Sequence, residues 1–131
     1  MVSLTTEEVT VSAVGSYQPE YSVPTRRQYV YAYQIRIENK SLRSVQLLSR
    51  AWEVISGTGE RRLVEGEGVV GQQPMILPGQ SHEYTSWVQF ETPVGAMNGS
   101  YVMRRSDRWG DGELFEVRVP RFVLIAPEML N

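Results

Sequence analysis

The sequence predicts an all-β fold, an antiparallel sandwich or barrel of seven to eight strands. Two observations support this. Apolar and polar side chains alternate with a period of two over most of the chain, and short runs of Gly, Pro, Asn and Ser separate the alternating stretches. In addition, no stretch shows the 3.6-residue periodicity of an amphipathic helix. Many closely spaced strands without helices are typical of two packed β-sheets.

The strongest strand signal lies in "QYVYAYQIRIENK". Tyr29, Tyr31, Tyr33, Ile35 and Ile37 fall on one face, and polar residues occupy most of the other. Aromatic and β-branched residues in alternation are typical of a strand with one buried face. We therefore expect this strand at the centre of the core.

Further strands are predicted in order along the chain. They are "EEVTVSAV", "SVQLLSRAWEVIS", "ERRLVEG", "SHEYTSWVQF", "MNGSYVMRR" and "ELFEVRVPRFVLI". In the last one, Pro120 cannot donate to a ladder and Phe122 continues in the opposite phase to Val119, which predicts a bulge or an edge. The longest irregular segment is expected at residues 15–27. One domain is predicted over residues 1–125, with residues 126–131 as a C-terminal tail.

Composition excludes several classes of function. The formal net charge of −2 argues against nucleic acid as the main partner, and the absence of cysteine excludes disulfides and thiolate metal sites. No apolar run approaches the ~18 residues of a membrane span, and the start "MVSLTTEEV" has no signal-peptide pattern. We therefore expect a cytoplasmic protein without a membrane partner.

The stretch "GEGVVGQQP" has the spacing of a dinucleotide-binding loop, with Gly66, Gly68 and Gly71 at G-x-G-x-x-G. Such a loop works by opening into a helix whose free N–H groups hold pyrophosphate. Here Pro74 and Pro78 would break that helix within two turns. The glycines are therefore expected to form turns or close contacts in a β-fold, with an anion-binding nest of N–H groups as the alternative.

Six blocks in order resemble the ApaG family: "YQIRIENKS", "LLSRAW", "GEGVVGQQP", "LPGQSHEYTS", "TPVGAMNGSY" and "FEVRVPRFVL". The resemblance spans nearly the whole chain and implies an immunoglobulin- or fibronectin-III-like β-sandwich. It also implies an association with cobalt resistance and magnesium handling, because bacterial members carry a Co2+/Mg2+ efflux label. A chain without a membrane segment cannot itself move ions across a bilayer, so we expect that link to be indirect. Related eukaryotic domains are protein-interaction modules, and the family offers no catalytic residues to transfer.

Two sets of candidate binding residues follow. A small anion or a nucleotide polyphosphate is the alternative ligand, and its expected site comprises Gly66, Gly68, Gly71, Arg50, Arg61 and Arg62. A protein partner is the main expectation, because exposed Trp and Arg are enriched at binding hot spots. The residues expected at that surface are Trp87, Arg108 and Trp109, and the same sheet face could form a homodimer. Trp52, by contrast, is expected in the core.

No enzyme, cofactor or metal centre is predicted. His82 is the single histidine, and its neighbour Ser81 would point to the opposite face of a strand. Carboxylates at i and i+2, such as Glu65 with Glu67, are more typical of a solvated surface than of a magnesium site. The sequence therefore predicts a non-enzymatic binding module.

Overall fold

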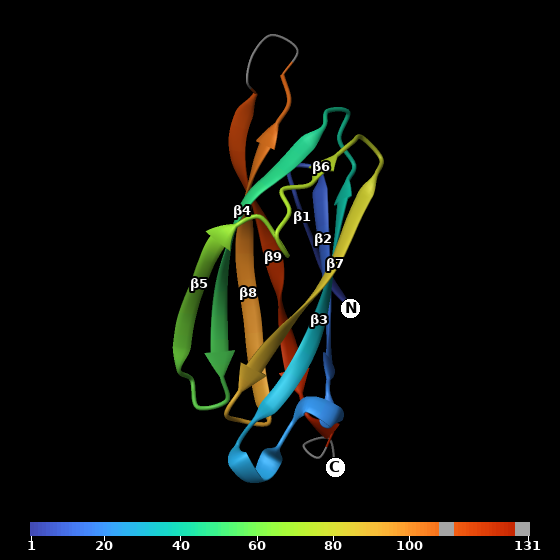
Figure 1. Ribbon diagram of the computed structural model, residues 1–131. Coiled ribbons are helices and arrows are strands. Elements are labelled where there is room, and N and C mark those ends of the chain that lie inside the picture. The colour runs from blue at the N-terminus through green and yellow to red at the C-terminus, as the bar shows by residue number, and fades with distance from the viewer. Residues whose placement is uncertain (108–111, 128–131) are drawn as a thin grey trace.

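The computed structural model describes residues 1–107 and 112–127 and confirms an all-β sandwich of two antiparallel sheets (Figure 1). The first sheet has the order β1-β2-β3-β7, with bounds Val2–Thr6, Val9–Tyr17, Tyr29–Asn39 and Ser81–Phe90. The second has the order β5-β4-β8-β9, with bounds Arg61–Glu67, Val45–Ser56, Val94–Arg105 and Glu113–Ile125. A two-residue strand, β6 (Met75–Ile76), also pairs with β4.

The predicted central strand is confirmed as β3, which pairs with β2 on one edge and β7 on the other. Tyr31, Tyr33, Ile35 and Ile37 are buried on its inner face. Trp52 is also buried, as predicted, and its ring packs edge-to-face on Tyr33 with 5.6 Å between centroids. Aromatic pairs of this geometry add to the hydrophobic gain of burial. These residues join the two sheets at the middle of the fold.

The predicted irregularity near Pro120 is a β-bulge. Met97 pairs with Phe122, whereas Gly99 pairs with Val119, so two residues of β9 oppose one residue of β8. The extra residue reverses the phase of β9, and both Val119 and Phe122 are therefore buried. The two halves of the strand share one core.

The first predicted strand is confirmed as β2, but it forms a hairpin with a strand that was not predicted, β1, which accounts for part of the difference between seven or eight strands and the nine of the described residues. β1 and β2 pair from Val2 opposite Ala13 to Thr6 opposite Val9. The two-residue connection, Glu7 and Glu8, has φ values of 44° and 69°. These angles fit a type I′ turn, which usually contains Asn or Gly. Two glutamates give no such signal in the sequence.

The segment expected to be irregular, residues 15–27, is partly ordered into a strand. β2 continues through it to Tyr17, which pairs with Tyr31 of β3. Two short 3-10 turns, η1 (Pro19–Tyr21) and η2 (Pro24–Arg26), complete the connection to β3. Each begins with proline, whose fixed φ suits a first helical position.

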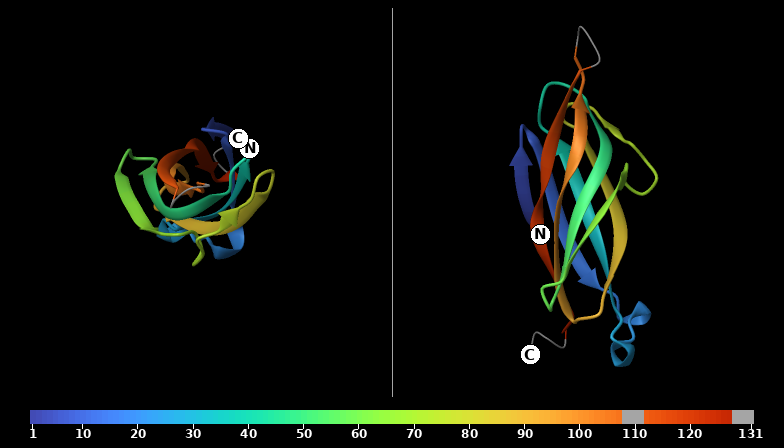
Figure 2. Two further views of the ribbon diagram at one scale, coloured as in Figure 1. Left: turned by 90° about the horizontal axis from the view of Figure 1, so that it is seen from above. Right: turned by 90° about the vertical axis from the view of Figure 1, so that its left-hand side faces the viewer.

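The two lateral sides of the sandwich differ. On the closed side, β1 and β2 pack against β9, and the Arg105 guanidinium donates to the Glu7 carbonyl over 2.5 Å. On the open side, β7 and β5 are end strands with one strand neighbour each. Figure 2 shows β5, in green, at the periphery of the barrel-like body. Arg62 of β5 crosses the open side, where its Nη2 donates to the Gln89 carbonyl of β7 at 3.3 Å.

Candidate functional site

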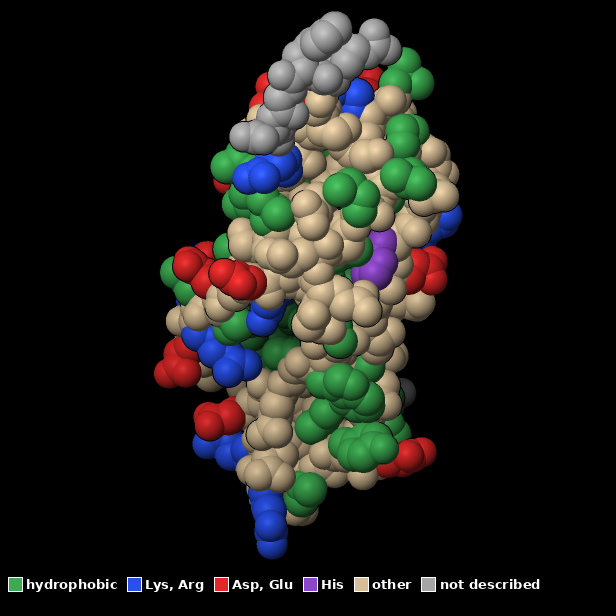
Figure 3. Space-filling model, turned by 45° about the horizontal axis from the view of Figure 1, so that its top comes forward, with side chains coloured by type: hydrophobic (Ala, Val, Ile, Leu, Met, Phe, Trp, Pro, Cys, Tyr) green, Lys and Arg blue, Asp and Glu red, His purple; other side chains and the backbone are tan. Residues whose placement is uncertain are grey.

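A groove of about 720 Å³ lies on the open side, between the end strands β5 and β7. Its volume falls within the ~300–1,000 Å³ typical of ligand sites. In Figure 3 a hollow with hydrophobic side chains in its floor is flanked by basic and acidic side chains. The sandwich therefore offers a concave surface where its two sheets separate.

The floor of the groove is apolar and rigid. Inward-facing residues of four strands form it: Tyr33, Trp52, Val54, Val88, Phe90 and Met97. Each of them is less than 10% exposed in the free chain. Because they belong to the core cluster, their positions are fixed by packing before any ligand arrives.

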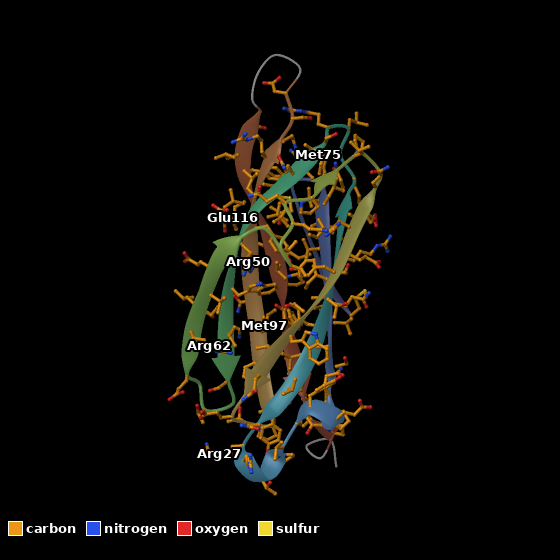
Figure 4. The ribbon with its side chains drawn as sticks, in the orientation of Figure 1. Arg27, Arg50, Arg62, Met75, Met97 and Glu116 are labelled. Atoms are coloured by element: carbon orange, nitrogen blue, oxygen red, sulfur yellow. The ribbon has the colours of Figure 1, made fainter. Side chains whose placement is uncertain are left out.

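The rim of the groove is charged. Arg27, Arg61 and Arg62 line it together with Glu60 and Glu91. Figure 4 places Arg27 at the lower end of the molecule and Arg62 along β5, with Met97 between the sheets. Arg27 is the C-cap of η2 and has φ 57°. Its position there depends on the η2 turn, which the sequence analysis does not predict.

The predicted cations Arg61 and Arg62 are neighbours on β5 but have different partners. Arg61 Nη1 lies 2.7 Å from Glu53 Oε1, in an exposed ion pair. Arg62 instead reaches across the groove to Gln89 of β7. Successive residues of a strand point to opposite faces, so the two guanidinium groups leave β5 in opposite directions.

Trp87 is 52% exposed, which confirms that it lies on the outer face of β7. It borders the groove, and its ring packs edge-to-face against Tyr21 of η1, with 5.3 Å between centroids. Tyr21 is itself 62% exposed. The structure thus adds a second aromatic residue to the predicted interaction surface. No pattern around Tyr21 could have shown this pairing.

The glycine loop turns the chain, and no helix follows it. The amide of Val69 donates to the Gln72 carbonyl at 2.8 Å, and the amide of Gln72 donates back to Val69 at 3.0 Å. Between them, Val70 and Gly71 have φ values of 47° and 74°. This is a two-residue type I′ turn, and β6 follows it. The expectation that the glycines serve the β-fold agrees with this geometry.

Gly68 is required by close packing. Its φ is +63°, and a Cβ there would lie 2.2 Å from the Gln72 carbonyl oxygen. Its amide donates to the Leu48 carbonyl at 2.8 Å. The residue therefore fits the loop against β4 through its backbone alone.

Arg50 contacts the glycine loop, as the predicted anion site requires, but its guanidinium donates to backbone carbonyls of the loop. Its Nη1 donates to the carbonyls of Glu67 and Gly68, each at 3.0 Å. A Cβ on Gly66 would lie 2.8 Å from that nitrogen, so the glycine makes room for the guanidinium. The contacts fasten the loop to β4. Anion binding at Gly66, Gly68 and Gly71 stays a prediction, and the amides of Gly68 and Val69 already have acceptors.

Two residues of the predicted interaction surface, Arg108 and Trp109, lie outside the described residues. Within the described ranges, no group of three or more His, Cys, Asp or Glu is arranged to hold a metal ion. Likewise, none of the helical turns described in residues 1–107 and 112–127 is long and apolar enough to cross a membrane.

Half-buried Tyr84 of β7 and buried Tyr101 of β8 link the two sheets by a hydrogen bond between their hydroxyls. Burial raises the pKa of Tyr84 well above its ordinary value, and the bond to Tyr101 offsets part of that rise. Burial also raises the pKa of Tyr101, and neighbouring Tyr84 adds to the effect. Both groups therefore stay neutral near neutral pH and act as structural hydrogen-bonding groups.

Comparisons with known proteins agree with this architecture. The ApaG domain family matches residues 19–105. The chain is 43% identical over 127 residues to Protein ApaG of Rhodospirillum centenum, covering 97% of this chain and 95% of the relative. It is also 43% identical over 124 residues to Protein ApaG of Ralstonia nicotianae, covering 95% of this chain and 97% of the relative.

A solved structure shows the same fold. The crystal structure of the protein named ApaA from Bordetella pertussis is 41% identical and has a TM-score of 0.85, covering 91% of this chain and 94% of the other. A second X-ray structure, 31% identical, has a TM-score of 0.86 and covers 95% of this chain and 91% of the other. The chain therefore belongs to the ApaG family.

Proposed function

We propose that this chain is a non-enzymatic binding module that acts in the cytoplasm by engaging a protein partner. The observation that carries the proposal is the groove between β5 and β7, whose preformed apolar floor is surrounded by a charged rim. Binding sites typically combine such a floor with a few polar groups that fix orientation. The exposed Tyr21–Trp87 pair beside the groove extends the apolar surface that a partner would cover.

The link to cobalt and magnesium homeostasis is proposed to be indirect and to pass through that partner. We expect purified protein titrated with Co2+ or Mg2+ to give neither binding heat nor a shift in Tm. A saturable heat with a matching rise in Tm would show direct metal binding and contradict this part of the proposal.

Photo-crosslinking in living cells tests the binding function. A photoreactive amino acid at Gln89, on the groove, is expected to trap a discrete protein. The matched control places it at Glu116, an exposed position on the outer face of β9, visible in Figure 4. A crosslinked species specific to position 89 supports the proposal. If positions 89, 87 and 21 all trap nothing while the protein is present at normal abundance, the binding-module proposal fails.

A further inference from the structure

We propose that the groove between β5 and β7 binds an extended acidic peptide. The peptide adds as a strand to the open edge of β7 and places apolar side chains on the floor of the groove. This inference rests on the proposed binding function and names the class of partner and its site. Four features of the open side support it: the unpaired strand edge, the direction of its backbone groups, the apolar floor and the free arginines.

The edge of β7 that faces the groove has no strand partner among the described residues. β7 pairs with β3 on its other edge only. An open strand edge presents a row of N–H and C=O groups and is a template for another strand. Proteins that recognise extended peptides use such an edge for main-chain hydrogen bonds, with pockets for alternate side chains.

The direction of the backbone groups is fixed by one hydrogen bond. The Gln89 carbonyl accepts from Arg62 of β5, so Gln89 directs its backbone toward the groove. Backbone groups of alternate residues along an antiparallel strand point to the same side. Trp87 and Thr85 therefore also present their N–H and C=O groups to the open edge. An incoming strand would find at least three residues in register.

The floor supplies the side-chain site. Val88 and Phe90 alternate with the edge-directed residues and face the core, next to Trp52 and Met97. A peptide strand paired with β7 would place every second side chain over this surface, because its side chains alternate as well. The apolar residues of the peptide would then meet the floor, and the residues between them would face the mouth.

Two guanidinium groups at the mouth of the groove are available to carboxylates. Arg27 and Arg62 have no ion-pair partner within the described part of the chain, and the ion pair of Arg61 is exposed. Glu60 directly precedes β5 and Glu91 directly follows β7, so both carboxylates lie at the same end of the groove as Arg62, the second residue of β5. Neither carboxylate pairs with Arg62, whose guanidinium donates to the Gln89 carbonyl instead. Guanidinium groups bind carboxylates with two parallel hydrogen bonds, which makes acidic side chains the complementary choice.

Arg62 occupies the position that the peptide would take. In the free protein its guanidinium donates to the Gln89 carbonyl, which is otherwise open to an incoming amide. A peptide amide bonded to that carbonyl would release Arg62, which could then bind an acidic side chain of the same peptide. One residue thus protects the free edge and recognises the ligand.

The test uses the full chain and a fluorescein-labelled heptapeptide in which aspartate alternates with valine, phenylalanine and valine. Fluorescence polarisation measures its affinity, and 15N NMR shifts locate its site. One control peptide carries lysine in place of every aspartate. The other keeps the acidic sequence but has N-methyl groups on alternate backbone nitrogens, which blocks strand pairing. We expect the first peptide to bind and to shift β5 and β7 signals, and both controls to bind at least about tenfold more weakly.

Variants of the protein identify the contacts. Arg62→Met is expected to weaken the acidic peptide about tenfold, since a charged hydrogen bond is lost from a partly desolvated site. Gln89→Pro removes the edge amide and is expected to weaken it by at least as much, while Gln89→Thr keeps the amide and the affinity. Arg36→Met, which removes a cation paired with Glu38 and Glu83 outside the groove, is the charge control and is expected to change affinity less than twofold.

Several results would overturn the inference. They are equal binding of the lysine or N-methylated peptide, shifts confined to residues outside the groove, or unchanged affinity in both Arg62→Met and Gln89→Pro. Inorganic tripolyphosphate serves as a competitor. If tripolyphosphate binds in the groove and the acidic peptide does not, the inference is also overturned. If a partner is trapped by crosslinking and its affinity is the same for the parent chain, Arg62→Met and Gln89→Pro, the proposed binding function stands and only this site is rejected.

Discussion

The closed and open sides of the sandwich show two treatments of the same structural problem, the edge of a β-sheet. On the closed side, β1 and β2 cover β9, and Arg105 stacks on Phe115 at 4.3 Å while it bonds to Glu7. On the open side, the end strands do not pair with each other, and Arg62 of β5 reaches Gln89 of β7 across the gap. An edge left open is an aggregation hazard. The open edge lies beside a buried apolar floor, and this combination is the basis of the proposed binding function.

The largest expected effect separates the floor of the open side from its outer surface. Trp52→Ala should lower the free energy of unfolding by about 3–5 kcal/mol, because a buried indole leaves a cavity among packed rings. Trp87→Ala is the matched control, and it should cost about 1 kcal/mol or less, since half of that side chain is exposed. Urea unfolding measures both. Equal losses would mean that the groove floor is not part of the core.

The second effect concerns the glycine loop. Gly68→Ala should destabilise the fold by about 1–3 kcal/mol, because its φ is positive and its Cβ would strike the Gln72 carbonyl. Val70→Asn should act in the opposite direction and raise Tm, since Asn tolerates the left-handed conformation that Val70 now holds. Thermal unfolding compares the two. A neutral Gly68→Ala would remove the structural explanation of the glycine spacing.

The third effect compares the cations of the two sides. Arg105→Met on the closed side should cost about 1 kcal/mol, through the lost contact with Phe115 and the lost bond to Glu7. Arg62→Met on the open side should change stability by less than about 0.5 kcal/mol, since its bond is exposed. Both values come from urea unfolding. A larger loss of unfolding free energy for Arg62→Met would mean that Arg62 holds β5 against β7 for stability.

The smallest effect lies at alkaline pH. The paired hydroxyls of Tyr84 and Tyr101 have raised pKa values, because the fold shields them from solvent, so the folded chain keeps their protons at a pH where the unfolded chain loses them. Stability from this pair is therefore complete below about pH 10 and declines as pH rises above it. Tyr84→Phe should flatten that decline relative to the parent chain. An unchanged slope between pH 9 and 11 would contradict the assignment.

The parts of the fold that follow alternation could be read from the sequence. The inner face of β3, the buried Trp52, the exposed Trp87 and the bulge near Pro120 each follow from side-chain period or from the missing proline amide. The two prolines after the glycine spacing likewise predict that no helix follows, and β6 follows instead. These features are local, so neighbouring residues carry their signal.

The parts that the sequence did not reveal depend on conformation or on distant partners. The turn at Glu7 and Glu8 adopts positive φ without glycine, and β2 continues past the expected irregularity at Gly15. The groove between β5 and β7 could not be predicted for the same reason. Arg27 and Gln89 join Arg62 only because β7 and β5 end their sheets on the same side. Strand order, which a single sequence does not show, creates the groove.

The hydrogen bonding of β5 has a consequence for how the groove adapts. This strand is held along one edge by β4, and six of its seven residues are exposed. A segment with so few buried contacts opens locally at lower cost than the core strands. Its amides should therefore be among the first strand positions to exchange with deuterium, well before those of β3. β5 is therefore the more flexible of the two strands that border the groove. A peptide bound there should slow the deuterium exchange of the β5 amides.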